Sequence, residues 1–244
     1  MAENSKIEWT DHIFNPLIGC MKVGPGCDGC YAENLMDHRY GRVRWGAGEP
    51  RIRTSVANWR KPVQWNRDAS GRDGHRPFVF CASLADVFDN EVDPLWRSDL
   101  FALIDATPNL VWLLLTKRIG NVLKMVTTLP GNAAIGATMV TQEEYDRDRM
   151  KLAAVKEALS PAFTFGSFEP LLGPIILDKN APDWVIVGGE TDQGQHKARM
   201  ADPDWFRGIR DQCDRLDRKF FMKQMTRKAP IPHDLLIRQW PEAA

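Results

Sequence analysis

The sequence lacks any long apolar run. No stretch of about 18 consecutive apolar residues occurs in its 244 positions. The first eleven residues also lack the apolar segment of a secretory signal. We therefore expect a cytoplasmic protein that does not associate with membranes.

Net charge is also absent, because 32 basic side chains balance 32 acidic ones. A neutral molecule has no general attraction for nucleic acid or for an anionic membrane. Any site for a polyanion must therefore be local.

Cysteine is scarce but concentrated. The chain has five cysteines, and three of them, Cys20, Cys27 and Cys30, fall within one short segment. In the reducing cytoplasm, an odd number of cysteines with this clustering favours metal ligation over a disulfide framework.

From residue 77 onward, short β-rich runs alternate with amphipathic stretches, as expected of a parallel sheet covered by helices. The expected strands span 77–83, 110–116, 133–138, 162–168, 184–188 and 220–223, with a first strand at 14–19. Asp93-Pro94, Thr141 with Glu144, and Asp202-Pro203 are helix-start signals, which predict helices over 95–106, 142–159 and 204–218. The pattern predicts an α/β fold, a partial (open) TIM-type barrel of about six to seven parallel strands, within a single domain over 1–244.

Residues 40–76 interrupt this pattern and predict an irregular insertion or lid. Basic residues alternate there with three tryptophans; the set is Arg42, Arg44, Trp45, Arg51, Arg53, Trp59, Arg60, Lys61, Trp65 and Arg67. Cations among stacking aromatics suit single-stranded nucleic acid or a flipped base. A solvated insertion anchored to the barrel by its tryptophans explains the same pattern.

The three clustered cysteines lie on a glycine-rich loop, Gly19 to Tyr31, after the expected first strand. Working sites of barrels form beyond the carboxyl ends of the strands. Three thiolates would hold a 4Fe-4S cluster and leave one iron open for S-adenosylmethionine. Two other interpretations stay open: a zinc site completed by His38 or His12, and three unligated thiols.

Polar residues also follow the other expected strands. Gly188, Gly189 and Glu190 would let a ligand approach the backbone and would offer a carboxylate to an ammonium group. Ser83 and Thr116 are further candidates for cofactor binding, and Lys117, Glu169 and Lys223 are candidates for catalysis at the same rim. Each of them has an ordinary structural explanation as a cap, a turn or an ion pair.

Two further residues are candidates. Cys81 shares strand parity with Ser83, so it is expected to face the barrel interior, where a thiol could donate a hydrogen atom; a buried apolar role is the alternative. Arg199 could pair with a carboxylate or a phosphate.

An ordered set of motifs resembles a known family, the phage-associated three-Cys-motif proteins, which look like a branch of the radical S-adenosylmethionine superfamily. The motifs are the Cys-x6-Cys-x2-Cys loop and the segments 5–10, 15–20, 83–88, 114–118, 169–174, 185–190 and 221–224. Two features differ from the usual superfamily pattern: the first cysteine gap is six residues instead of three, and the Gly-Gly-Glu turn comes late in the chain.

The resemblance implies an iron-sulfur enzyme. Cys20, Cys27 and Cys30 would hold the cluster, and the Gly-Gly-Glu turn would contact the amino group of S-adenosylmethionine. The enzyme would abstract a hydrogen atom from a small-molecule or nucleotide substrate and would need a reductant protein such as a flavodoxin or ferredoxin. A zinc-stabilised protein that binds nucleic acid or a partner without catalysis is the alternative.

Overall fold

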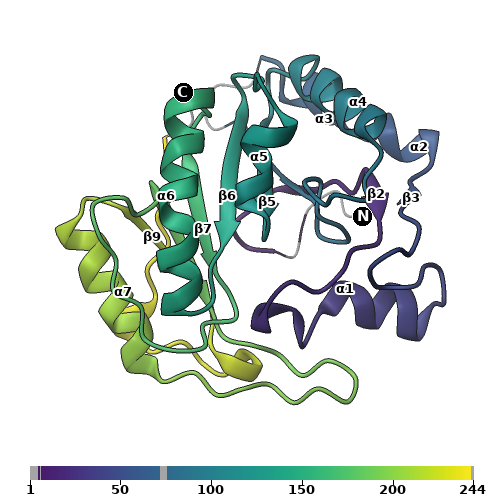
Figure 1. Ribbon diagram of the computed structural model, residues 1–244. Helices are drawn as coiled ribbons and strands as arrows, with labels where there is room; N and C mark the ends of the chain where they lie inside the picture. Colours follow the sequence, from purple (N-terminus) through teal and green to yellow (C-terminus); the bar gives the residue numbers. More distant parts are fainter. Residues whose placement is uncertain (1–4, 6, 72–75, 243–244) are drawn as a thin grey trace.

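A curved sheet of seven parallel strands forms the centre of the molecule. The computed structural model describes residue 5 and residues 7–71 and 76–242. The strands lie in the order β1 (His12–Ile13), β4 (Phe78–Cys81), β5 (Val111–Thr116), β6 (Ala133–Thr138), β7 (Thr164–Phe168), β8 (Trp184–Gly188) and β9 (Lys219–Gln224). Because β1 and β9 lie at opposite edges, the sheet is an open half-barrel, and the predicted α/β partial barrel is confirmed (Figure 1).

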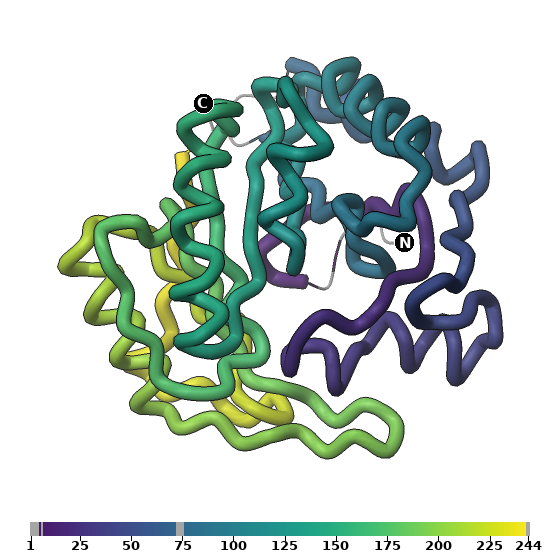
Figure 2. The backbone as a smooth tube through the Cα atoms, in the orientation of Figure 1, coloured from purple at the N-terminus to yellow at the C-terminus, as the bar shows by residue number. Residues whose placement is uncertain are grey.

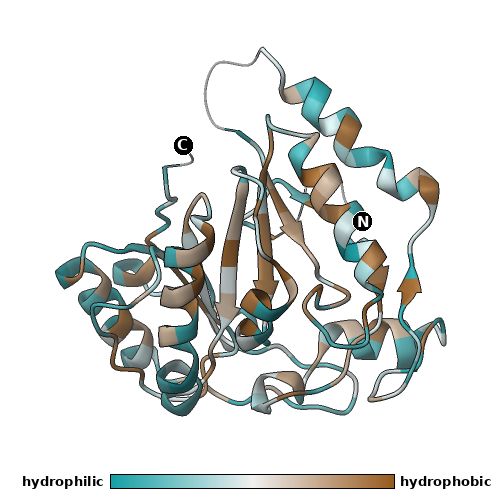
Figure 3. Cartoon of the chain, turned by 45° about the horizontal axis from the view of Figure 1, so that its top comes forward, coloured by the Kyte–Doolittle hydropathy of each residue, from teal (hydrophilic) through white to brown (hydrophobic). Residues whose placement is uncertain are grey.

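Two apolar layers cover the two faces of the sheet. The outer layer joins alternate strand residues such as Val79 and Trp112 to the helices. The inner layer, over the described residues, contains no helical residue and is rich in aromatic rings, including Phe80, Phe165 and Trp184. Strands buried on both faces are continuously apolar, as Figure 3 shows. Alternation along each strand therefore decides which side chains reach the interior.

The helices that cover the outer face include the three that the sequence predicted. They are α4 (Pro94–Asp105), α6 (Gln142–Leu159) and α7 (Pro203–Arg215). Their capping side chains, Asp93, Thr141 and Asp202, accept hydrogen bonds from backbone N–H groups of the first turn. A further short helix, α5 (Ile119–Met125), was not predicted.

The first strand of the sheet lies earlier than predicted. The sheet takes up His12–Ile13, whereas Leu17–Ile18 (β2) pairs in antiparallel fashion with Ile52–Arg53 (β3) outside the main sheet. Pro16 separates the two segments and has no N–H to donate to a ladder. The chain therefore leaves the sheet after the backbone N–H of Phe14 has bonded to Phe80.

The prediction of an irregular insertion over 40–76 is wrong in part. The segment contains β3 and two helices, α2 (Val56–Trp59) and α3 (Lys61–Ala69); residues 72–75 lie outside the described residues. Trp65 is buried and stacks on His12 with ring centroids 4.4 Å apart, and Trp59 meets Phe14 edge-on. These aromatics anchor α2 and α3 to the barrel, which explains why the helices need few aliphatic residues.

The N-terminal half of the chain also contributes a helical segment beside the cysteine loop. It consists of α1 (Tyr31–Glu33) and a π-helical turn, η2 (Asn34–Arg39). Short 3-10 turns follow elsewhere at Pro25–Cys27 (η1), Thr226–Lys228 (η3) and His233–Leu235 (η4). Among the described residues, no helix is both long and apolar enough to span a bilayer.

Candidate functional site

A cavity of about 940 Å³ opens at the carboxyl ends of the strands. Most of the predicted site residues line it: Cys20, Cys27, Cys30, Ser83, Thr116, Lys117, Glu169, Gly189, Glu190 and Lys223. They come from separate segments of the chain, which the parallel sheet brings to one rim. Gly188 and Cys81 do not line this cavity.

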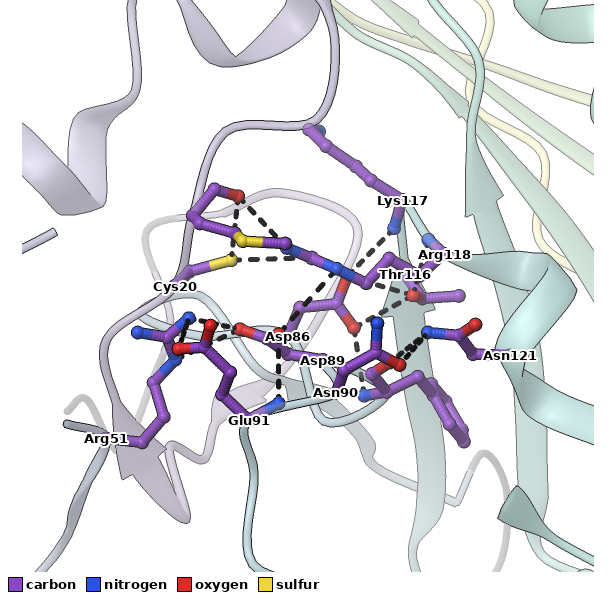
Figure 4. A network of polar contacts seen from close by, with 12 residues as sticks. Cys20, Arg51, Asp86, Asp89, Asn90, Glu91, Thr116, Lys117, Arg118 and Asn121 are labelled. Carbon is purple, nitrogen blue, oxygen red and sulfur yellow. Dashed lines mark hydrogen bonds and ion pairs between the residues drawn. The ribbon is translucent and has the colours of Figure 1, made fainter. Parts of the chain in front are cut away.

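A buried arginine lies against the first cysteine. The Arg118 guanidinium lies 3.5 Å from the Cys20 sulfur, 3.0 Å from the Met21 carbonyl and 3.0 Å from the Asp86 carboxylate. Figure 4 shows Cys20, Arg118 and Asp86 in one network. Burial and then Asp86 raise the pKa of the Cys20 thiol to about 11, while Arg118 acts in the opposite direction. The cation therefore offsets part of the cost of a buried thiolate.

Asp86 organises this wall of the cavity. Its carboxylate accepts hydrogen bonds from the Thr116 hydroxyl at 2.8 Å and from the Lys117 backbone N–H at 3.1 Å. Thr116 in turn accepts a bond from the Arg118 backbone N–H. The Thr116 hydroxyl thus supports Arg118 and already has two partners. Ser83, similarly, is bonded to Asn15 at 3.1 Å.

Cys27 and Cys30 lie on a second wall of the cavity, where glycines of the loop touch other elements. A Cβ at Gly26 would lie 2.9 Å from Val140, and one at Gly29 would lie 2.6 Å from His196. Cys27 is only 7% exposed. Burial raises the pKa of Cys30, and hydrogen bonds from the backbone N–H groups of Glu33 and Ala32 at the start of α1 oppose that shift.

The Gly-Gly-Glu turn has a structural explanation in this chain. A Cβ at Gly189 would lie 2.2 Å from the Thr226 backbone nitrogen, so glycine is needed for the close approach of the segment after β9. The Gly188 carbonyl accepts from the Leu171 N–H, and the Gly189 carbonyl accepts from the Gln224 side chain. These backbone groups are therefore occupied within the protein.

The Glu190 carboxylate is also occupied. One oxygen lies 2.7 Å from Arg199 Nη2 and 3.0 Å from His196 Nε2, and the other accepts from the Arg199 backbone N–H and Nε. Burial opposes ionisation, but the bonds from Arg199 and His196 outweigh it and hold the pKa of Glu190 below its usual value. The structure thus places a carboxylate at the rim but gives it partners, Arg199 and His196, from its own loop.

The remaining charged groups face the cavity between these walls. Lys223 forms an ion pair with Glu169, with 2.7 Å from Nζ to Oε2. The side chain of Lys117 extends away from Asp86 (Figure 4), and its ammonium forms no ion pair with the described carboxylates. Lys117 is therefore available to an anionic ligand.

The expectation that Cys81 faces the barrel interior is wrong. Cys81 belongs to the outer layer with Val79, because Phe78 and Phe80 occupy the inner positions of β4. The thiol is fully buried, which raises its pKa well above the usual value. A hydrogen-atom donor in the cavity cannot come from this position.

The histidines proposed for a zinc site lie elsewhere. His12 stacks on Trp65, and His38 is exposed on η2; neither lines the cavity. Over the described ranges, no three His, Cys, Asp or Glu side chains converge as ligands of a single metal ion. A cluster differs from a single ion in this respect, because each thiolate binds a separate iron.

Strand parity reveals site residues that we did not predict. Thr138 is the last residue of β6 and Ser167 the last but one of β7; both are on the inner face, line the cavity and are buried. Each lies two residues after an inner-facing residue, Gly136 or Phe165, so alternation within the predicted strands contains this signal. Arg118 and Asp86 are different, because only tertiary contacts show their pairing.

A family model described as "Protein of unknown function (DUF5131)" matches residues 4–233. The chain belongs to this DUF5131 family. No curated protein matches the sequence.

The DUF5131 chain is similar in fold to solved structures of spore photoproduct lyase. A single-site mutant of the lyase shares 10% identity at a TM-score of 0.56, over 91% of this chain and 78% of the lyase. A double mutant, solved with bound AdoMet and dinucleoside spore photoproduct, shares 12% identity at a TM-score of 0.50, over 92% of this chain and 58% of the lyase. The open half-barrel of this chain matches the partial TIM barrel of these radical S-adenosylmethionine enzymes.

Proposed function

We propose that this protein is a radical S-adenosylmethionine-type iron-sulfur enzyme whose cluster is held by Cys20, Cys27 and Cys30. The observation that carries the proposal is that all three thiols line one cavity at the carboxyl-terminal rim of an open half-barrel. Working sites of barrel enzymes form at this rim. A lyase of the same fold was solved with AdoMet bound.

The surroundings of the three thiols fit a cluster of thiolates. Arg118 places a cation beside Cys20, and backbone N–H groups of Glu33 and Ala32 point at Cys30. Both features stabilise thiolates, which are the form that binds iron. When bound, a 4Fe-4S cluster supplies the electron that cleaves the sulfonium of S-adenosylmethionine.

Three charged residues would handle the bound molecules. We assign Lys117 to the carboxylate of S-adenosylmethionine, because its ammonium has no described carboxylate partner and lies on the same rim as Cys20. The Glu169–Lys223 pair, which lines the same cavity, can hold a polar group of the substrate and exchange a proton with it.

We assign the substrate to the nucleobases or nucleotides, on the evidence of an arginine-rich surface beside the cavity. Arg39 and Arg42 each lie 5.5 Å from the centre of the Tyr40 ring, which is half exposed. Neither arginine forms an ion pair with a described carboxylate, and Trp45, a few residues on, lines the cavity. Two adjacent cations around one exposed ring suit a phosphate and a stacked base.

Other members of the predicted nucleic-acid surface have structural partners. Arg51 is buried against Asp89 at 2.7 Å, and Arg53 pairs with Asp99 and stacks on Trp59. The substrate surface that we propose is therefore smaller than the whole 40–76 segment.

Anaerobic reconstitution with iron and sulfide tests the enzyme proposal. We expect iron and sulfide matching one 4Fe-4S cluster per chain, and 5′-deoxyadenosine after reduction in the presence of S-adenosylmethionine. A Cys27→Ala variant should lose both, whereas Cys213→Ala, in the outer layer, should keep both. Stoichiometric zinc without iron, or an intact cluster without 5′-deoxyadenosine, would contradict the proposal.

Binding of a fluorescent single-stranded oligonucleotide tests the substrate class. An Arg39→Gln/Arg42→Gln variant should bind more weakly by about tenfold or more, because two phosphate contacts are lost. Arg67→Gln, on α3, removes a charge elsewhere in the basic 40–76 segment and is the control. Equal losses in both variants would contradict the assigned surface.

A further inference from the structure

Arg199 joins two loops that are far apart in the sequence. Its guanidinium lies 2.7 Å from Glu190 Oε1, 3.0 Å from Asp28 Oδ2 and 2.9 Å from the Pro25 carbonyl. Glu190 ends the Gly-Gly-Glu turn, whereas Pro25 and Asp28 flank Cys27 in the cysteine loop. Figure 2 shows the loop after β8 running alongside the N-terminal segment that carries the cysteines.

The contact continues on both sides of this arginine. Gly29, between Asp28 and Cys30, packs so closely on His196 and Glu190 that a Cβ there would lie 2.6 Å from the imidazole and 3.0 Å from the carboxylate. Further along, Gly194 packs on Asn34 beside α1. The loop after β8 therefore covers the cysteine loop from Pro25 to the start of α1.

We propose that Arg199 and Glu190 position Cys27 and Cys30 for the cluster, so that the Gly-Gly-Glu turn of this chain holds the metal loop instead of the amino group of S-adenosylmethionine. This inference rests on the proposed function. It follows from the occupancy of the turn: both oxygens of Glu190 and the carbonyls of Gly188 and Gly189 have partners within the protein.

The long gap between Cys20 and Cys27 explains why the cysteine loop would need to be held in place. The six residues between Cys20 and Cys27 lead into the 3-10 turn Pro25–Cys27, and a longer loop has more conformations to lose when it binds iron. Arg199 bonds the first residue of that turn, and its fork of donors fixes direction as well as distance. Pre-ordering the turn lowers the entropic cost of binding the cluster.

We call the contact of Arg199 and Glu190 with the cysteine loop the clamp. Alkylation of the metal-free chain tests the clamp in the absence of a cluster. Iodoacetamide labelling, followed by mass spectrometry of each cysteine peptide, should show Cys27 reacting about tenfold faster in Arg199→Ala than in the parent chain, because local opening exposes it. Arg199→Lys should give an intermediate rate, since it keeps the charge but loses the fork. Cys81 and Cys213 are the internal references, because both are buried in the outer apolar layer.

Arg207→Ala is the matched control. Arg207 has a similar side-chain exposure, 36% against 34% for Arg199, and pairs with two carboxylates on α7 and η4. It should leave the Cys27 rate unchanged. If Arg199→Ala accelerates all five cysteines equally, or leaves Cys27 unchanged, the clamp proposal is overturned.

Iron retention then connects the clamp to the cluster. In reconstituted protein, Arg199→Ala should lose iron to a chelator several-fold faster than Arg207→Ala. A parent chain that takes up no cluster defeats the proposed function and leaves the alkylation result as the test of the clamp. A cluster equally stable in both variants overturns the clamp and leaves the proposed function standing.

Discussion

The two walls of the cavity hold their cysteines by different physical means. At Cys20, the Arg118–Asp86 pair is buried, with side chains 7% and 8% exposed. At Cys27 and Cys30, Arg199 is one-third exposed and acts between two loops. Water screens the Arg199–Glu190 pair more than the Arg118–Asp86 pair. The Arg118–Asp86 pair therefore stabilises the fold and places a cation beside Cys20. The Arg199 contacts mainly fix the geometry of the cysteine loop and contribute less to the free energy of unfolding.

Removing the buried cation should break this comparison most strongly. Arg118→Met leaves Asp86 charged and buried, so we expect a loss of about 3 kcal/mol in the free energy of unfolding, measured with urea. Arg118→Met/Asp86→Asn should recover part of that loss, because no unpaired charge remains. Strictly additive losses would show that the two groups do not interact.

A substitution at Gly189 should have the next largest effect on the free energy of unfolding. Gly189→Ala places a Cβ 2.2 Å from the Thr226 nitrogen, and backbone cannot move aside as a flexible side chain does. We expect a loss of about 2 kcal/mol in thermal or urea unfolding. Gly173→Ala is the control, since nothing lies within 4 Å of its added Cβ; a neutral Gly189→Ala would contradict the close packing.

Neutralising Glu190, the carboxylate of the clamp, should have a smaller effect on stability, and that effect should depend on pH. The folded pKa of Glu190 is lowered from 4.5, so its ionised form stabilises the fold above that pH and the contribution is lost as pH falls through the folded pKa. Glu190→Gln should cost about 1 kcal/mol at neutral pH. The difference from the parent chain should shrink at acid pH; a difference independent of pH would indicate that shape, and not charge, matters at this position.

The smallest effect on stability is expected at Lys117. Its ammonium forms no described ion pair, so Lys117→Met should change the free energy of unfolding by less than about 0.5 kcal/mol. Affinity for S-adenosylmethionine, measured by equilibrium dialysis under anaerobic conditions, should nevertheless fall about tenfold. A large loss of stability with unchanged affinity would remove Lys117 from the binding site.

Local signals in the sequence determined most of the barrel. Continuous apolar runs such as 111–115 are typical of strands buried on both faces, and a capping residue followed by proline specifies where a helix starts. These rules act over a few residues, so most of the parallel strands, the three main helices and the rim of polar residues were all predictable.

Only the tertiary structure decided which groups are free and which are occupied. Leu17–Ile18 is a plausible strand, yet its partner is Ile52–Arg53, because Pro16 diverts the chain from the main sheet. Glu190 follows a strand end and resembles a ligand in the sequence, yet Arg199 and His196 contact its carboxylate. The Thr116 hydroxyl likewise donates a hydrogen bond to Asp86. Hydrogen bonds and ion pairs between distant segments depend on distances that no local pattern encodes, so the sequence located the rim of the site and the fold assigned the partners within it.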